Sequence, residues 1–235
     1  MKIKLNNKAI AAAVMLLGLV SCKKNFLENT PPDSVSTQIF WASEADTRSA
    51  IAGVYSRLQQ NYLGYERVYL DALSDNAWAW DNTNQTNLAV MTTGGISPAL
   101  TGAIANMYSS PYRAITSCNY FLDNVDRAPI TDALKNTFKA EVRFIRALCY
   151  FDLVQGWGGV PLYDRFFATL AEANVAQSSK EQVYDFINAD LDFAIANLVD
   201  EKYNGRVIKG SAQALKARVL VTQQRWPEAA SLCQQ

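Results

Sequence analysis

The segment from residue 75 to residue 87 combines two indole rings with short carboxylate and amide side chains. Trp78 and Trp80 alternate with alanines, and Asp81 and Asn82 follow directly. Indole rings offer flat apolar faces, while carboxylates and amides can pair with neighbouring hydroxyl groups. Small-molecule pockets combine such an aromatic wall with a few oriented polar groups. We therefore predict that members of this group of four contact a hydroxyl-rich ligand such as a sugar. The alternative is a structural loop in which a Trp side chain is buried in the hydrophobic core.

Other kinds of chemistry find little support in the sequence. The chain has no histidine, which excludes Ser-His-Asp and Cys-His catalysis and HExxH zinc sites. The EF-hand calcium pattern fails after Asp81, because Thr83, Gln85 and Thr86 stand at the wrong places. Glycoside hydrolysis needs two facing carboxylates, and Asp75 with Asp81 is the only plausible pair near the indoles. We predict no catalytic residue, no metal and no cofactor, and hydrolysis is the less favoured alternative.

Charge argues against a nucleic-acid partner. Lys and Arg number 22 and Asp and Glu number 22, so no basic excess is available to neutralise phosphates. The hydrophobic fraction of 49% is ample for a buried core.

The N-terminus has the pattern of a lipoprotein signal. Three lysines precede an apolar run from Ala9 to Val20, which is shorter than the roughly 20 residues of a membrane span. The run from Leu19 to Cys22 resembles a bacterial lipobox, which implies a diacylglycerol on the Cys22 sulfur, cleavage before Cys22 and acylation of the new amine. Lys23 follows in place of the Asp that signals inner-membrane retention, so we expect an outer-membrane anchor. The expected organisation is a signal peptide at 1–21, a tether at 22–37 and a helical domain at 38–235.

Helical periodicity dominates the rest of the chain. Ser43 and Ser179 each open a pattern typical of a capping box, and Pro111 can occupy the first turn of another helix. A further long helix is expected to end near Gly156. Alternating strand patterns are short and rare, so the predicted class is all-α, built from helical hairpins. Three cysteines fall in apolar helical patterns and are expected to be buried: Cys118, Cys149 and Cys233.

Charged residues on the long helix are expected to be structural. Glu141, Arg143 and Arg146 fall within an apolar pattern, so we predict ion pairs to neighbouring helices instead of catalytic roles. The last helix begins at Pro227 and has only two turns, so we expect the chain to be the N-terminal part of a longer protein.

Several stretches in order resemble the SusD/RagB family of nutrient-binding outer-membrane lipoproteins of Bacteroidetes. The match spans nearly the whole chain after the signal peptide. The stretches are the lipobox with Phe26–Glu28, Phe40–Trp41 with Ala50–Tyr55, Ser74–Trp78, Ala140–Leu153 with Gly156–Leu162, Val183–Tyr184 with Asp190–Leu191, and Gly205–Arg206 with Ala214–Arg218.

The resemblance implies tetratricopeptide-like helical hairpins of the SusD-like type, with long loops that build the ligand site. It also implies a lipid-anchored protein that delivers a glycan or other nutrient to a SusC-like, TonB-dependent barrel. We expect this protein to face the cell surface, and a periplasm-facing anchor is the alternative, because Lys23 and Lys24 stand where surface-exposed members often carry acidic residues. A helical-repeat scaffold that binds only protein partners is the alternative. The nutrient-binding and scaffold interpretations differ in whether Trp78 and Trp80 face solvent or the helical core.

Overall fold

The described part of the chain is built from helices. A computed structural model describes residues 40–79, 87–201 and 205–234. Within these ranges no extended strand forms, and Pro161 pairs with Gln177 in an isolated antiparallel bridge. The predicted all-α class is therefore confirmed. The proposed lipid-bearing Cys22 and three of the four predicted ligand residues, Trp80, Asp81 and Asn82, lie outside the described residues.

Seven α-helices and four 3₁₀ helices are described. The α-helices are α2 (Glu44–Ser56), α3 (Leu88–Thr92), α4 (Ala103–Asn124), α5 (Asp132–Trp157), α6 (Lys180–Asn197), α7 (Lys209–Thr222) and α8 (Trp226–Cys233). The 3₁₀ helices are η2 (Arg57–Gln59), η3 (Asn61–Leu63), η4 (Tyr65–Leu73) and η6 (Val125–Arg127). None of these helices is long and apolar enough to cross a bilayer.

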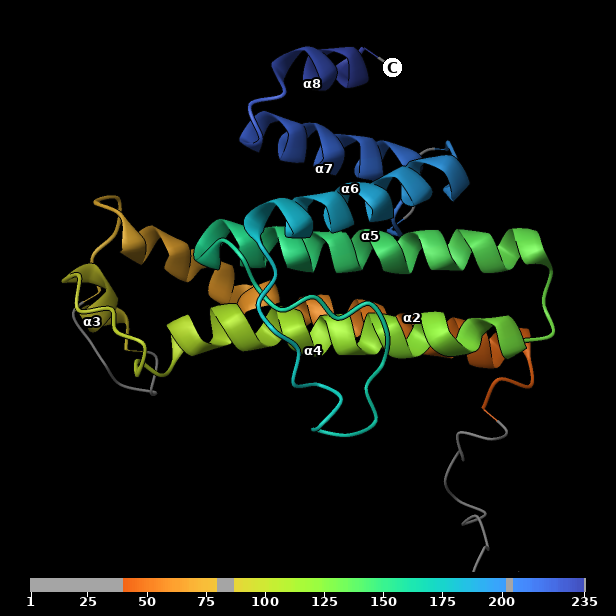
Figure 1. The fold of residues 1–235 in the computed structure, drawn as a ribbon, viewed down its shortest axis with the longest axis horizontal. Coiled ribbons are helices and arrows are strands. Elements are labelled where there is room, and N and C mark those ends of the chain that lie inside the picture. Colours follow the sequence, from red (N-terminus) through yellow and green to blue (C-terminus); the bar gives the residue numbers. More distant parts are fainter. Residues whose placement is uncertain (1–39, 80–86, 202–204, 235) are drawn as a thin grey trace, which may run out of the picture. The chain divides into compact units, whose positions relative to one another are not determined.

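The helices of the unit from Trp41 onward stack in chain order. From α4 to α8 each helix packs against the next, and α2 lies beside α4 (Figure 1). The centre of the stack is α5, which buries twelve residues along its length, including Ile145, Tyr150 and Leu153. A fully buried Ile or Leu side chain contributes about 1.5–3 kcal/mol to the free energy of folding. The packing of α5 against α4 and α6 therefore holds the unit together.

Two of the predicted helix starts are confirmed by their caps. The Ser43 hydroxyl accepts from the Asp46 backbone N–H at 3.1 Å, which begins α2. At α6, Ser179 and Gln182 form the full reciprocal capping box. Each cap satisfies donors that the first turn of a helix leaves unpaired.

The predicted helix start at Pro111 is wrong. α4 begins at Ala103 and runs through Pro111, which is buried inside it. Proline lacks an N–H and disfavours a helix interior. Here the apolar positions of α4, including Ala114 and Ile115, are completely buried, and this tertiary packing outweighs the local preference.

A buried ion pair joins the three central helices. Arg146 of α5 donates Nε and Nη2 to the two carboxylate oxygens of Asp190 in α6, at 2.7 and 2.8 Å. Its Nη1 donates to the side-chain oxygen of Asn119 in α4 at 2.7 Å and to the Asp164 carbonyl at 3.1 Å. Arg143 adds a longer contact of 3.9 Å to Asp190. The predicted structural role of these charges is confirmed.

Removing one partner of this pair should be costly. Asp190→Asn leaves the buried Arg146 charge without a counter-ion, and we expect it to lower the free energy of unfolding by about 3–5 kcal/mol. Asp192→Asn, in the same helix, removes an exposed pair with Lys216 and should cost at most about 1 kcal/mol. Chemical denaturation of the two variants measures the difference, and equal midpoints would contradict the role given to Asp190.

The cysteines differ in burial. Cys118 and Cys149 are completely buried, as predicted, whereas Cys233 is exposed and that prediction is wrong. In the described structure α8 packs mainly against α7 and buries only Ala229, which leaves Cys233 at the surface. Burial raises the pKa of the Cys118 thiol to about 12 and the pKa of Cys149 well above its usual range. The reactive thiolate is therefore suppressed at both buried positions.

Thiol labelling tests this difference. With N-ethylmaleimide at neutral pH, we expect native protein to be modified at Cys233, and at Cys118 and Cys149 only after denaturation. Peptide mass spectrometry locates each adduct, and Cys233→Ser is the matched control. Modification of Cys118 at the rate of Cys233 would show that the α4–α5 contact is open.

Candidate functional site

Trp78 projects into solvent. Its side chain is 70% exposed, so it does not plug the core. The backbone beside it is tied to α3, because the Ala79 carbonyl accepts from the Thr92 hydroxyl at 3.3 Å. Exposure of Trp78 favours ligand binding over a purely structural loop. Contact with a ligand stays a prediction for Trp78 and for the three predicted residues that lie outside the described residues.

The segment from Asn87 to Gly102, which contains α3, forms a closed loop next to Trp78. The Asn87 side-chain amide donates to the carbonyl and the hydroxyl of Thr101, both at 3.1 Å, and so joins the two ends of the loop. After α3 the chain turns at Gly94, whose φ of +75° is readily adopted only by glycine. A Cβ on Gly95 would lie 2.8 Å from the Val90 side chain. These constraints fix the course of the chain from Ile96 to Leu100.

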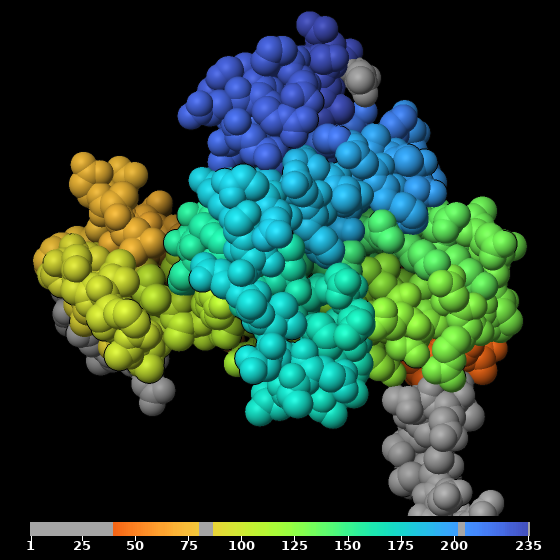
Figure 2. Space-filling model, in the orientation of Figure 1, coloured from red at the N-terminus to blue at the C-terminus, as the bar shows by residue number. Residues whose placement is uncertain are grey.

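A cavity of about 620 Å³ lies between this loop, the start of α4 and the end of α5. In Figure 2 the yellow residues around α3 form, with the orange 3₁₀ helix η4, a lobe at one end of the helical stack. The cavity is lined by Ile96, Ser97, Pro98, Leu100, Ile104, Ala105, Tyr108 and Trp157. Its size falls in the range of small-molecule sites.

Two aromatic rings form one wall of this cavity. Tyr108 of α4 meets Trp157, the last residue of α5, edge to face with ring centroids 5.2 Å apart. Gly158 caps α5 with φ +71°, which turns the chain away just after the indole. Tyr112 supports Tyr108 from one turn further along α4, with centroids 5.1 Å apart. Trp157 therefore packs back onto α4 at the end of α5.

Tyr112, which supports the aromatic wall, stays uncharged. Burial, followed by the hydrogen bond with Tyr108, raises the pKa of Tyr112 far above its usual range. The Tyr112 hydroxyl therefore remains protonated and donates to the Pro161 carbonyl at 2.9 Å. None of the described residues that line the cavity carries a charge. Such a site suits a neutral ligand with apolar faces, held by aromatic contact and a few hydroxyl or indole N–H donors.

The sequence did not point to this cavity as a site. Tyr108 and Trp157 both lie at regular helical positions, where an aromatic residue usually belongs to the core. The one usable signal is the glycine pair Gly94 and Gly95, which marks a tight turn after a short helix.

The described residues offer no support for the catalytic or metal chemistry considered from the sequence. Asp75, one half of the only candidate carboxylate pair, is exposed on the surface, and its partner Asp81 lies outside the described residues. Among residues 40–79, 87–201 and 205–234, no group of three or more Cys, Asp or Glu side chains is placed to hold a metal ion.

Comparisons with known proteins agree with this architecture. A family model described as "Starch-binding associating with outer membrane", of the SusD-like type, matches residues 25–221. SusD-like protein P25 of Formosa agariphila is 29% identical over 95% of this chain and 44% of its own length. A SusD-like protein of Bacteroides ovatus is 24% identical over 96% of this chain and 41% of its own. The chain thus spans less than half the length of these relatives.

Solved structures share the fold. A laminarin-binding SusD-like protein superposes with a TM-score of 0.73 at 27% identity, covering 83% of this chain and 43% of that one. A SusD-like protein of Bacteroides fragilis gives a TM-score of 0.74 at 25% identity, over 87% and 40% of the two chains. The tetratricopeptide-like arrangement of helices is therefore confirmed, and the chain belongs to the SusD-like family.

Proposed function

We propose that this protein captures a neutral glycan at Trp78 and at the aromatic cavity lined by the α3 loop, without cleaving it. Two observations carry the proposal: Trp78 is 70% exposed on a segment that is hydrogen-bonded to α3, and the loop that contains α3 lines a cavity walled by Tyr108 and Trp157. Sugar rings present apolar C–H faces that stack on such rings, and uncharged donors suit their hydroxyl groups. The absence of charge among the described lining residues favours neutral sugars.

The relatives support a glucan as the first ligand to test. The matching family model carries the description of starch binding, and one similar solved protein is named for laminarin binding. This chain covers 43% of that laminarin-binding chain, so ligand identity is part of the proposal.

The proposal includes a place at the outer membrane. Cys22 would carry the lipid, and the surface-facing helical domain would hand its ligand to a SusC-like, TonB-dependent barrel. The lipobox at Leu19–Cys22 and the family's described association with the outer membrane support this placement. Two acyl chains are enough for durable anchoring.

A binding measurement tests the aromatic site. Isothermal titration of the full-length protein with laminarin and with starch oligosaccharides should give saturable binding to at least one of them. We expect Trp78→Ala to weaken that binding about tenfold, because a stacked ring contributes roughly 1–2 kcal/mol. The free energy of unfolding should stay within about 0.5 kcal/mol of the original, because the side chain is exposed.

Trp226→Ala is the matched control, since Trp226 is exposed on α8, far along the chain from the cavity. It should leave glycan binding unchanged. Equal losses in both variants, or no glycan binding at all, would favour the protein-binding scaffold. Shortened oligosaccharides after incubation would instead establish hydrolysis.

Palmitate labelling tests the anchor. Cells that express the protein should incorporate radiolabelled palmitate into it, and Cys22→Ser should abolish the label because the thioether cannot form. Cys233→Ser, which removes an exposed thiol of α8, should keep the label. An unlabelled protein would contradict the proposed anchor while leaving the glycan proposal standing.

A further inference from the structure

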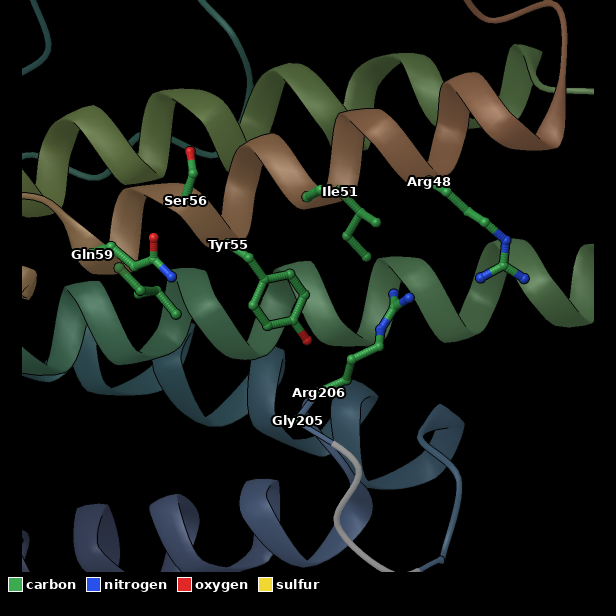
Figure 3. Close-up of a pocket in the computed structure, with 9 residues that line it drawn as sticks. Arg48, Ile51, Tyr55, Ser56, Gln59, Gly205 and Arg206 are labelled. Atoms are coloured by element: carbon green, nitrogen blue, oxygen red, sulfur yellow. The ribbon is translucent and has the colours of Figure 1, made fainter.

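A second cavity, of about 490 Å³, lies between α2 and the segment that leads into α7. Figure 3 shows Arg48, Ile51 and Tyr55 projecting from α2 toward α5, with Arg206 reaching in from the opposite side. No described residue lines both this cavity and the aromatic one. The two cavities also differ in chemistry, because this one has two guanidinium groups at its walls.

The two guanidinium groups converge on one aromatic ring. The Arg48 and Arg206 guanidinium carbons lie 5.5 and 5.4 Å from the centroid of the Phe138 ring, which is buried in α5. Attraction to the ring face helps to hold both cations in place. A ligand in the cavity therefore meets two guanidinium groups that pack on the same ring, each of them also paired with a carboxylate.

Arg206 is fixed by a buried network. Its Nε and Nη2 donate to the two oxygens of Glu141 at 3.0 and 2.8 Å, and the Glu141 side chain is only 4% exposed. The Tyr55 hydroxyl also donates to Glu141 and accepts from the Val207 backbone N–H at 3.0 Å. This network joins α2, α5 and the start of the α7 segment, so Arg206 and Tyr55 form a rigid wall.

Arg48 is held much more loosely. It pairs with Glu44, four residues earlier in α2, at 2.6 Å, and both side chains are about half exposed, at 51% and 49%. Exposed pairs of this spacing contribute only about 0.3–0.5 kcal/mol. A ligand carboxylate can therefore replace Glu44 at little cost and bind the planar guanidinium through two parallel hydrogen bonds.

The remaining lining matches an oligosaccharide in which one ring bears such a carboxylate. Ile51 supplies apolar contact one turn from Arg48 (Figure 3). Leu58 and the Gln59 amide, about 15 Å further along the helical segments, can meet a neighbouring ring and its hydroxyl groups. From this arrangement we propose that the Arg48 cavity binds an acidic sugar residue, a uronic acid, through its carboxylate. This is a second site, and it does not depend on glycan binding at Trp78.

Titration with a charged and an uncharged form of one sugar tests the proposal. Trigalacturonate should bind the full-length protein, and binding should weaken as salt is raised because the pair is partly exposed. The fully methyl-esterified trisaccharide, which has the same rings without the charges, should bind at least about tenfold more weakly, and Arg48→Gln should not change whatever binding remains. Acetate alone should bind far more weakly than the trisaccharide, because it cannot contact Gln59 and the apolar wall together.

Two variants of α2 should act in opposite directions. Arg48→Gln should weaken trigalacturonate binding about tenfold or more, since a hydrogen-bonded charge pair is lost. Glu44→Gln removes the competing carboxylate and should tighten binding about twofold, the equivalent of the lost surface pair. Arg225→Gln is the matched control, because Arg225 forms a comparable exposed pair with Glu228 at the start of α8. It should leave binding unchanged.

Each result decides the proposal. Failure of trigalacturonate to bind, equal binding of its methyl ester, or wild-type affinity in Arg48→Gln would overturn it. Equal affinity for acetate would overturn the assignment to a sugar. If Arg48→Gln binds laminarin or starch as the original protein does, the Arg48 site is independent of the one at Trp78. Failure of either proposal would then leave the other standing.

Discussion

The guanidinium of Arg146 is enclosed where α4, α5 and α6 meet, and it donates to a side chain on each neighbouring helix. Buried ion pairs add little net stability, because desolvation offsets most of their attraction. Their geometry is nevertheless demanding, since each donor must find its acceptor. Asn119 then donates to the carbonyls of Tyr163 and Arg165, which ties the loop after α5 to the same point. The three helices pack around this cation, and its contacts help to fix the register of α4 against α5. The contact between Tyr108 and Trp157 depends on that register.

The two cavities illustrate two ways of presenting a binding surface. The aromatic one has walls of packed rings, and its loop is closed by Asn87 and shaped by Gly94. None of its described lining residues is charged, so the selectivity proposed for it would depend on shape and on ring faces. The other places a fixed cation, Arg206, beside an exchangeable one, Arg48. Rigid neighbours reduce the entropy lost on binding, while the surface pair keeps the exchangeable cation oriented before a ligand arrives.

Sequence patterns predict the helices better than they predict the site. The caps at Ser43 and Ser179 are local signals and are confirmed, because the hydrogen bonds that make them lie within one turn. Pro111 misleads, because packing around α4 overrides a local preference. Cys233 misleads for a related reason: an apolar helical pattern does not reveal how much of a helix a neighbour covers. Residue types alone led to the prediction at Trp78, which stays a prediction, whereas the cavity and the Arg206–Glu141 contact depend on segments far apart in the chain and have no local signal.

The length of α5 has a geometric consequence. Phe138, beneath the two guanidinium groups, and Trp157, at the aromatic wall, belong to the same uninterrupted helix. At about 1.5 Å of rise per residue they are separated by roughly 28 Å along its axis. A mono- or disaccharide is too short to bridge that span, so it can gain only one contact at a time. A long polymer with both neutral and acidic units could instead contact both cavities at once. After it binds at one cavity, the distance between the cavities along α5 would set the effective concentration for binding at the other.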